Sequence, residues 1–324
     1  MVSSPLEFDG GNVYVDLRHA LSVPLLLKCE GFNFARSIKI KAAVAMVADA
    51  EERGELVPGS TIVESSSGNL GVALGMIAAS RGYRFICVTD ARCTHSSKRM
   101  MEALGAEVHI ITTPDPLGGF LSARINHVRR LCAAGPHMVW LNQYANPCNW
   151  GAHYRSTGPE ILAEVPDLEV AFIGAGTTGT LMGCARYFRD AGSPAKIVAV
   201  DAVGSVTFGG SAGRRMIPGL GTGVRPAQLD ESYVDDVVFV EERDTVETCR
   251  ALAVKGFLFG GSTGTVVHGA RRWLAANRPG EDVRAVAIAP DFGEGYLDSV
   301  YDDEWVSTMH ADDQAVTSSG NAFA

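Results

Sequence analysis

The chain has 324 residues, about twice the length of one common domain, so we expect two lobes rather than a lone small binding module. Hydrophobic residues make up 46% and charged residues 20% of the chain, which is a globular rather than a disordered composition. The formal net charge of -9 argues against nucleic-acid or membrane partners bound by general attraction. Any anionic ligand must therefore be held by local groups.

No apolar stretch approaches the roughly 20 residues that span a bilayer, and the N-terminus lacks the pattern of a signal peptide. We therefore expect a cytoplasmic protein. The seven cysteines are scattered and include no C-x-x-C pair, so neither a disulfide framework nor a metal site is predicted. Imine chemistry would have to use one of only six lysines, which are Lys28, Lys39, Lys41, Lys98, Lys196 and Lys255.

Short apolar stretches alternate with helical periodicity through most of the chain, which predicts an α/β fold of two open, twisted, mostly parallel sheets with helices on both faces. The segment 204–226 is rich in Gly, Arg and Pro and has little periodicity, so we predict a long functional loop. Residues 309–324 are predicted to form a flexible tail. In chain order, the predicted elements are strand 61–64, a helix from 69, strand 84–88, a helix from 95, strand 107–111, a helix from 119, strands 138–141 and 169–173, a helix from 178, strand 196–200, helices from 246 and 263, and strand 284–289.

A glycine-rich turn follows the strand at 169–173. Gly174, Gly176 and Gly179 form G-x-G-x-x-G, and the next strand ends in Asp201. This is a dinucleotide fingerprint, so an NAD(P)-dependent dehydrogenase is one hypothesis. The pattern itself shows only a turn without bulky side chains before a helix N-terminus, and such a terminus binds any phosphate. Tight packing of the strand against the helix, without a ligand, is the simpler alternative.

A second turn, Ser65 to Gly68, also joins a strand to a helix, and Asn69 follows it. Helix capping alone would explain one of these residues, because Ser and Asn are preferred N-caps. One cap does not need three serines, a glycine and an asparagine. A dinucleotide enzyme has no evident use for two anion cradles, whereas an enzyme that holds a cofactor phosphate and a substrate carboxylate needs both.

Five segments occur in the order and spacing of the cysteine synthase family, and the resemblance covers roughly residues 12–305. These segments are 66–71, 142–147, 156–160, 176–180 and 260–264. The family is pyridoxal-phosphate dependent, has fold type II as in the tryptophan synthase β subunit, and forms homodimers. The resemblance implies a larger domain of residues 12–34 and 146–308 that anchors the cofactor phosphate. It also implies a smaller mobile domain, 35–145, that carries the reactive lysine and the substrate carboxylate loop.

The resemblance places the Schiff base with pyridoxal 5'-phosphate on Lys39. The family motif N-P-G-G-S-x-K-D-R reads N-F-A-R-S-I-K-I-K here, from Asn33 to Lys41. Both glycines and the Asp-Arg pair are missing, so Lys41 is a rival, and a catalytically silent regulator is a further alternative. Asn69 would bind the ring hydroxyl, and Ser262 would face the pyridine nitrogen. The cofactor phosphate would be held by Gly176, Thr177, Thr178, Gly179 and Thr180.

Three further stretches resemble one branch of the family, the N-(2-amino-2-carboxyethyl)-L-glutamate synthases of 2,3-diaminopropionate biosynthesis in siderophore and peptide-antibiotic pathways. They are residues 142–154, 201–209 and 290–297. The implied reaction joins O-phospho-L-serine to L-glutamate and releases phosphate, with a cysteine synthase as the alternative. The substrate carboxylate would be bound by Ser66, Ser67, Gly68 and Gln143. The anionic substrates require cations, and the candidates for the second-substrate site are Arg124, Arg36 and Arg225, with Tyr144 and Tyr296 lining it.

Overall fold

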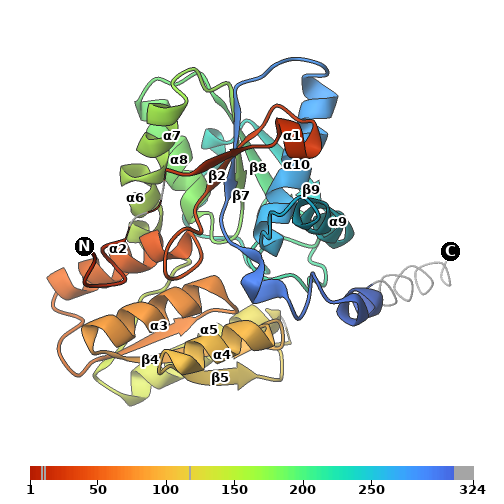
Figure 1. Ribbon diagram of the computed structural model, residues 1–324. Helices are drawn as coiled ribbons and strands as arrows, with labels where there is room; N and C mark the ends of the chain where they lie inside the picture. The colour runs from red at the N-terminus through yellow and green to blue at the C-terminus, as the bar shows by residue number, and fades with distance from the viewer. Residues whose placement is uncertain (9, 11, 117, 310–324) are drawn as a thin grey trace.

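The computed structural model describes residues 1–8, 10, 12–116 and 118–309, which form two stacked α/β layers (Figure 1). A six-stranded sheet has the order β1-β2-β10-β7-β8-β9, and a four-stranded sheet has the order β5-β4-β3-β6. Every strand pair is parallel except β1 with β2. The predicted α/β class with mostly parallel sheets is therefore confirmed.

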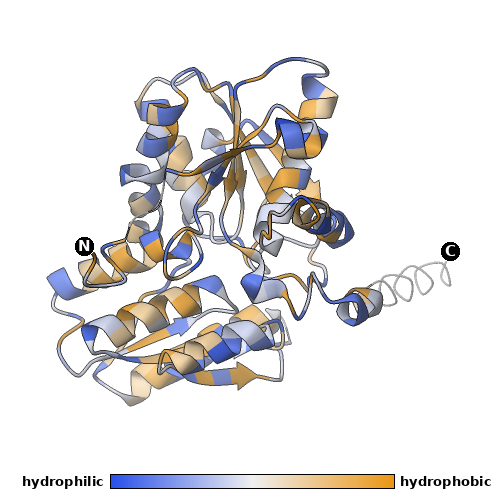
Figure 2. Ribbon diagram, in the orientation of Figure 1, coloured by the Kyte–Doolittle hydropathy of each residue, from blue (hydrophilic) through white to orange (hydrophobic). Residues whose placement is uncertain are grey.

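The six-stranded sheet is buried on both faces, so its central strands are almost continuously apolar. Figure 2 shows this as an apolar sheet interior with polar colour on the outer helix faces. Its strands are β1 (Tyr14–Asp16), β2 (Leu26–Cys29), β7 (Val170–Gly174), β8 (Lys196–Ala202), β9 (Asp236–Val240) and β10 (Ala285–Ala289). Around it lie α1 (Arg18–Leu21), α6 (Pro147–Arg155), α7 (Thr157–Glu164), α8 (Gly179–Asp190), α9 (Glu242–Ala253) and α10 (Gly261–Asn277), with the short 3₁₀ turns η1 (Glu231–Tyr233) and η2 (Gly293–Tyr296).

The four-stranded sheet has its own apolar cores on its two faces. Its strands are β3 (Thr61–Ser65), β4 (Arg84–Asp90), β5 (Glu107–Ile111) and β6 (Met138–Trp140). The helices that pack on it are α2 (Lys39–Glu52), α3 (Asn69–Arg81), α4 (His95–Ala103) and α5 (Gly119–Ala134). No helix in the described part of the chain is long and apolar enough to cross a membrane.

All the predicted strands are present, and most predicted helix starts are correct to within two residues. The helix predicted from Val246 begins four residues earlier, because the first turn of α9 is polar and acidic and has no apolar periodicity. Strands β1, β2 and β9 and helices α1, α2, α6 and α7 were not predicted. Strand β2 could not be predicted from hydrophobic periodicity because Lys28 interrupts its apolar sequence. In the structure this lysine is fully buried and forms ion pairs.

The loop prediction for 204–226 is confirmed, since residues 203–230 contain no helix or strand. Most of the predicted tail, residues 310–324, lies outside the described residues. Its first predicted residue, Met309, is buried among Ile217, Val246 and Val300, so the chain is still packed at 309.

Helices α6 and α8 pack so closely that one glycine decides their separation. A Cβ at Gly183 in α8 would clash with the Trp150 carbonyl oxygen and lie 2.6 Å from the His153 Cβ. We expect Gly183→Ala to lower the free energy of unfolding by about 1–3 kcal/mol, because backbone cannot yield as a side chain does. Urea unfolding followed by circular dichroism measures this change.

Gly75→Ala in α3 is the matched control. Its Cβ would meet Leu104 at 3.5 Å, an ordinary contact, and alanine favours a helix over glycine by about 0.5–1 kcal/mol. We therefore expect Gly75→Ala to be neutral or stabilising. Equal stability of the Gly183→Ala and Gly75→Ala proteins would contradict the close α6–α8 packing.

Candidate active site

The carboxyl ends of β3, β7 and β10 open onto a cavity of about 840 Å³ between the two sheets. Parallel strands place the loops that follow them at one edge, which is where α/β proteins bind ligands. The cavity is lined by most of the residues predicted from sequence. These are Lys39, Ser66, Ser67, Gly68, Asn69, Arg124, Gln143, Tyr144, Gly176, Thr177, Thr178, Gly179, Thr180, Ser262 and Tyr296.

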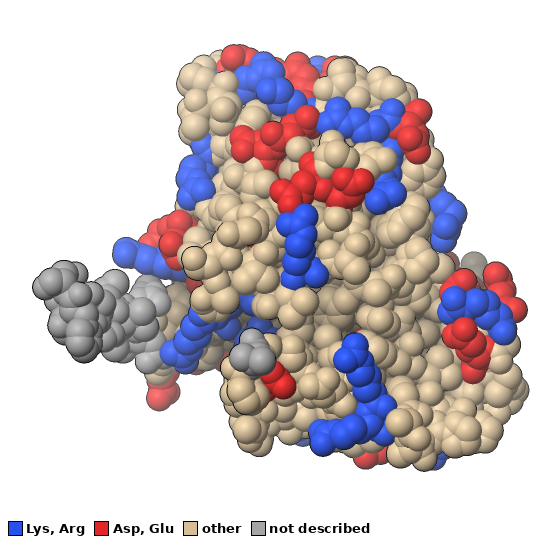
Figure 3. Space-filling view, turned by 180° about the vertical axis from the view of Figure 1, so that it is seen from behind, with Lys and Arg blue, Asp and Glu red and all other residues tan. Residues whose placement is uncertain are grey.

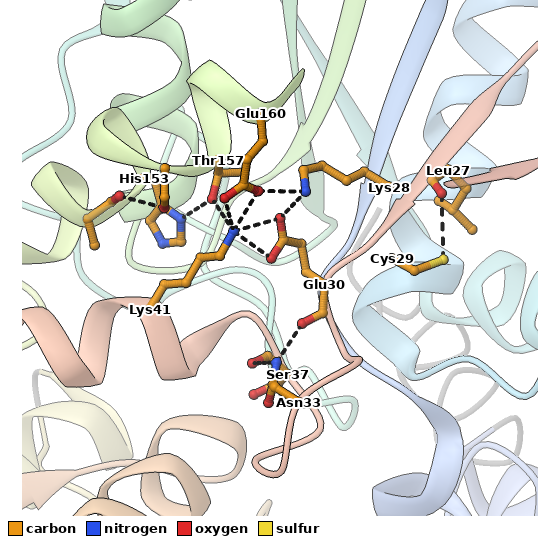
Figure 4. Close-up of polar contacts among 12 residues, drawn as sticks. Leu27, Lys28, Cys29, Glu30, Asn33, Ser37, Lys41, His153, Thr157 and Glu160 are labelled. Carbon is orange, nitrogen blue, oxygen red and sulfur yellow. Dashed lines mark hydrogen bonds and ion pairs between the residues drawn. The ribbon is translucent and has the colours of Figure 1, made fainter. Parts of the chain in front are cut away.

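Lys39 is the first residue of α2, and its half-buried side chain lines the cavity. Burial lowers the pKa of the Lys39 amine from its usual 10.5 to about 8, although the charge of Asp291 opposes this shift. The rival Lys41 is engaged elsewhere, since its Nζ lies 2.9 Å from Glu160 Oε2 and 3.0 Å from Glu30 Oε2 (Figure 4). Lys39, rather than Lys41, therefore presents an amine to the cavity.

Asp291 is a buried carboxylate that sequence reasoning did not select. It accepts hydrogen bonds from Asn69 Nδ2 at 2.9 Å, from the Tyr296 hydroxyl at 2.6 Å and from Thr263 Oγ1 at 3.2 Å. Burial raises the pKa of Asp291. A carboxylate at this position requires Asn69 to direct its NH₂ group toward it, so the orientation of that amide is set. The signal for Asp291 was its place just after the carboxyl end of β10.

Residues 176–180 form a cradle at the N-terminus of α8, where backbone N–H groups are unpaired in the helix. Thr178 has a positive φ of 64°, which turns the chain sharply before the helix. A Cβ at Gly176 would lie 2.6 Å from the Gly219 carbonyl oxygen, so the backbone here is closely packed. The buried Thr178 Oγ1 has no hydrogen-bond partner among the described residues. These donors fit a phosphate group.

The dinucleotide alternative does not fit the acidic residue at the end of β8. Asp201 is fully buried, and its Oδ1 accepts a hydrogen bond from the Ala202 N–H. It is not among the described residues that line the cavity. A ribose-binding carboxylate must reach the ligand, so the fingerprint indicates the phosphate cradle only.

The serine turn at 65–68 is held by the loop after β6. Gln143 Nε2 donates to the Ser65 carbonyl oxygen at 2.8 Å, and the Gly71 N–H donates to Ser66 Oγ at 3.0 Å. Ser66 therefore caps the start of α3, as the capping alternative predicted. The N–H groups of Ser66 and Gly68 are also paired, with the Val88 carbonyl oxygen and with Ser66 Oγ, whereas the Ser67 hydroxyl takes no part in this capping and lines the cavity.

Four arginines, Arg92, Arg124, Arg214 and Arg215, line the cavity, and only Arg124 was predicted from the sequence. Arg124 is buried, with its Nε 3.2 Å from Asp90 Oδ2, and its Nη1 has no hydrogen-bond partner among the described residues. Arg92 also pairs with Asp90, at 2.9 Å. Arg215 is 8% exposed, and its Nε makes no hydrogen bond within the described chain. Burial and then the charge of Arg92 lower the pKa of Arg215.

The other two predicted arginines lie outside the cavity. Arg36 is 3.5 Å from Glu294 with 60% of its side chain exposed, and Arg225 is 2.5 Å from Glu231 with 51% exposed. Exposed pairs of this kind are common over the surface, where basic and acidic side chains intermix on the face shown in Figure 3. The structure therefore does not bring Arg36 or Arg225 to the other site residues.

The fold and the cavity define a class of enzyme that binds an aldehyde cofactor through a lysine and a phosphate cradle. Residues 14–291 match the family model described as "Pyridoxal-phosphate dependent enzyme". The chain belongs to this pyridoxal-phosphate dependent enzyme family. The predicted cofactor and the fold type II, cysteine synthase-like class are thereby confirmed.

Two curated relatives are named N-(2-amino-2-carboxyethyl)-L-glutamate synthase. The protein of Ralstonia nicotianae is 41% identical over 287 residues, which is 88% of this chain and 84% of that relative. The protein of Cupriavidus metallidurans is 36% identical over 318 residues, 95% of this chain and 92% of that relative. Among solved structures, a mutant of O-ureido-L-serine synthase with O-ureido-L-serine bound has a TM-score of 0.85 and 30% identity, covering 96% of this chain and 99% of that one.

The low pKa of Lys39 predicts its reactivity toward an amine-selective acylating reagent. Only the neutral amine reacts, so in the apoprotein labelling of Lys39 should rise with pH and be half-maximal near pH 8. Asp291→Asn removes the negative charge that favours the ammonium, so its half-maximal labelling should fall at a lower pH. Peptide mass spectrometry at short times reports the labelling of each lysine.

Exposed Lys196, on the outer end of β8, provides the internal reference for the reagent's own pH dependence. A Lys39 profile that coincides with that of Lys196 would show that burial does not depress the Lys39 pKa.

Proposed function

We propose that this enzyme catalyses a β-replacement that joins O-phospho-L-serine to L-glutamate, forming N-(2-amino-2-carboxyethyl)-L-glutamate and phosphate. One observation carries the proposal: a single cavity combines the Lys39 amine and the phosphate cradle with the buried, incompletely paired Arg124 and Arg215. A sulfide nucleophile would not need these cations, whereas glutamate brings two carboxylates. The names of the two curated relatives support the same reaction.

When bound, pyridoxal phosphate supplies an aldehyde that condenses with amino groups and a ring that withdraws electrons from the substrate Cα. Lys39 would hold the cofactor and, once displaced by substrate, would take the proton from Cα and later return it. The Lys39 pKa of about 8 suits both tasks, since the group can be neutral as base and charged as acid near neutral pH. Ser262 would face the ring nitrogen, and a neutral partner there favours expulsion of a β leaving group.

The remaining residues would bind and orient. Ser66, Ser67, Gly68 and Gln143 would hold the phosphoserine carboxylate, and Asn69, oriented by Asp291, would donate to the ring hydroxyl. Gly176, Thr177, Thr178, Gly179 and Thr180 would hold the cofactor phosphate. Water must be excluded, because it would compete with glutamate for the reactive carbon. The irregular segment 204–226, which contributes Arg215 and Met216 to the cavity wall, is placed to cover it.

We assign the second-substrate site to the arginine side of the cavity, with Arg124, Arg215 and Tyr144 as its contacts. Arg92 supports Arg124 through their shared partner Asp90. Although burial raises the pKa of Asp90, its contacts with the two arginines outweigh this effect and lower it, so Asp90 stays ionised. Asp90 thus holds one side of the Arg92 guanidinium and of the Arg124 guanidinium, and both side chains line the cavity, where an anion would bind.

We also propose that residues 35–145 form the mobile smaller domain and residues 12–34 and 146–308 the larger one. All four strands of the smaller sheet fall within the first range, and all six of the larger sheet fall in the second. We further propose a homodimer that works in the cytoplasm, which suits the seven free cysteines, in a 2,3-diaminopropionate pathway for a siderophore or peptide antibiotic.

The direct test is incubation of the holoenzyme with phosphoserine and glutamate. We expect a coupled amino acid with the mass of N-(2-amino-2-carboxyethyl)-L-glutamate, and one phosphate released per product. Lys39→Ala should abolish both, because no other described lysine lines the cavity. Cysteine formed from phosphoserine and sulfide, without any coupled product, would instead assign a cysteine synthase, and no phosphate release at all would indicate a catalytically silent protein.

Arg215→Gln tests the second-substrate site. We expect the KM for glutamate to rise at least tenfold with little change in the KM for phosphoserine, because a hydrogen bond to a charged group contributes about 1.5–3 kcal/mol. Arg243→Gln, on the exposed face of α9, is the control and should leave both constants unchanged. An equal rise in both KM values for Arg215→Gln would contradict the assignment of Arg215 to the glutamate site.

A further inference from the structure

A chain of buried polar contacts joins the helix of Lys39 to the phosphate cradle. Lys41 Nζ, on α2, lies 3.3 Å from Thr157 Oγ1, and Thr157 Oγ1 lies 3.0 Å from His153 Nδ1. On the other side of the ring, His153 Nε2 lies 3.2 Å from Thr180 Oγ1, in the cradle. Thr157 and His153 are at most 1% exposed, so bulk water does not replace these contacts (Figure 4).

The direction of each hydrogen bond follows from the first donor. An ammonium group donates only, so Thr157 Oγ1 accepts from Lys41. The Thr157 proton must then go to another acceptor, and His153 Nδ1 is the one within reach in the described structure. The His153 ring is neutral, because burial, with the charges of Lys41 and Lys39, lowers its pKa well below 6.5. A neutral ring that accepts at Nδ1 carries its single proton on Nε2.

Nε2–H then donates to Thr180 Oγ1. That oxygen is occupied as an acceptor, so its own proton is left for a partner in the cavity that Thr180 lines. We propose that His153 is a positioning residue that orders these protons, so that Thr180 always presents a hydroxyl donor to an anionic oxygen in the cradle. The inference rests on the proposed assignment of residues 176–180 to the cofactor phosphate.

The first donor is itself held in place by a cluster of four buried or partly buried charges, Lys28, Glu30, Lys41 and Glu160. Lys28 Nζ is 2.8 Å from both Glu30 Oε1 and Glu160 Oε2, and Lys41 Nζ contacts the same two carboxylates. The three N–H groups of Lys41 are thus matched by Glu30, Glu160 and Thr157. The cluster has no net charge. Because its residues lie on or next to β2, α2 and α7, these elements fix the position of the Lys41 ammonium group and thereby the direction of the hydrogen bonds from Lys41 to Thr180.

The first measurement is the protonation of His153 in the full-length holoenzyme and apoprotein. Long-range proton–nitrogen NMR correlation distinguishes the two neutral histidine tautomers, and the signal that disappears in His153→Gln identifies the residue. We expect the Nε2–H tautomer in both forms. In Lys41→Met, whose methionine cannot donate, this preference should weaken. An Nδ1–H tautomer in the unmodified protein would overturn the proposal without any variant having to fold.

The second measurement is the affinity of the apoprotein for pyridoxal phosphate compared with pyridoxal, which lacks the phosphate. Thr180→Val and His153→Asn, whose shorter amide cannot reach Thr180, should each weaken pyridoxal phosphate binding about tenfold and leave pyridoxal binding unchanged. His153→Gln keeps an N–H donor near the Nε2 position, so it should lose less than threefold.

The double variant separates the possible failures. If His153 acts through Thr180, His153→Asn combined with Thr180→Val should bind pyridoxal phosphate no more weakly than Thr180→Val alone. An additive loss, or a loss with Thr180→Val but none with His153→Asn, would refute the role of His153. If Thr180→Val does not alter the preference for the phosphorylated compound, the assignment of the cradle itself fails, whatever the tautomer of His153.

Discussion

The site depends on one electrostatic constraint: a lysine amine must be enclosed enough to lose its proton near neutral pH and still face an open cavity. Lys39 meets both conditions because it is the first residue of α2, at the edge where the parallel strands of the two sheets present their carboxyl ends. Burial alone would depress its pKa further, and the nearby carboxylate of Asp291 limits the shift to about 8. The position and the pKa of this amine therefore have the same structural origin.

The cavity also gathers positively charged side chains that are only partly paired with carboxylates. The protein is acidic overall, yet its cavity wall contains Arg92, Arg124, Arg214 and Arg215. Asp90 holds two of these arginines, and burial leaves Arg215 and part of Arg124 incompletely paired. A buried, incompletely paired cation is costly, and a bound carboxylate or phosphate relieves that cost. The proposed binding of anionic substrates thus relies on a local imbalance of charge rather than on the net charge of the protein.

Sequence reasoning predicted what depends on contiguous residues. The turns at 65–68 and 176–179 could be predicted because each is a contiguous run of glycine and hydroxyl residues between a strand and a helix, a pattern typical of anion binding at a helix N-terminus. Asp291 and Arg215 were missed because their importance arises from neighbours distant in the chain. Arg36 was selected for its place beside the lysine motif, but it adopts a positive φ of 58° and its side chain extends to Glu294 at the surface. Proximity along the chain did not predict the direction of that side chain.

Helix α2 shows why the lysine can stay in place if the smaller lobe moves. Its start is anchored to the six-stranded sheet, because Ile38 belongs to that apolar core and Lys41 is paired with Glu30 and Glu160. Its later residues, such as Met46, pack with the four-stranded sheet instead. The start of α3 and the residue before α4 contact the segment after β10 through polar groups, Asn69 with Asp291 and Thr94 with the Gly295 carbonyl oxygen. Polar contacts exchange with water at little cost, whereas apolar cores do not. A rotation of the smaller lobe would therefore move Asn69 and the serine turn more than Lys39, which lies within residues 35–145 but is held at the start of α2 by the larger sheet. The substrate carboxylate loop would then close on a base that stays fixed relative to the phosphate cradle.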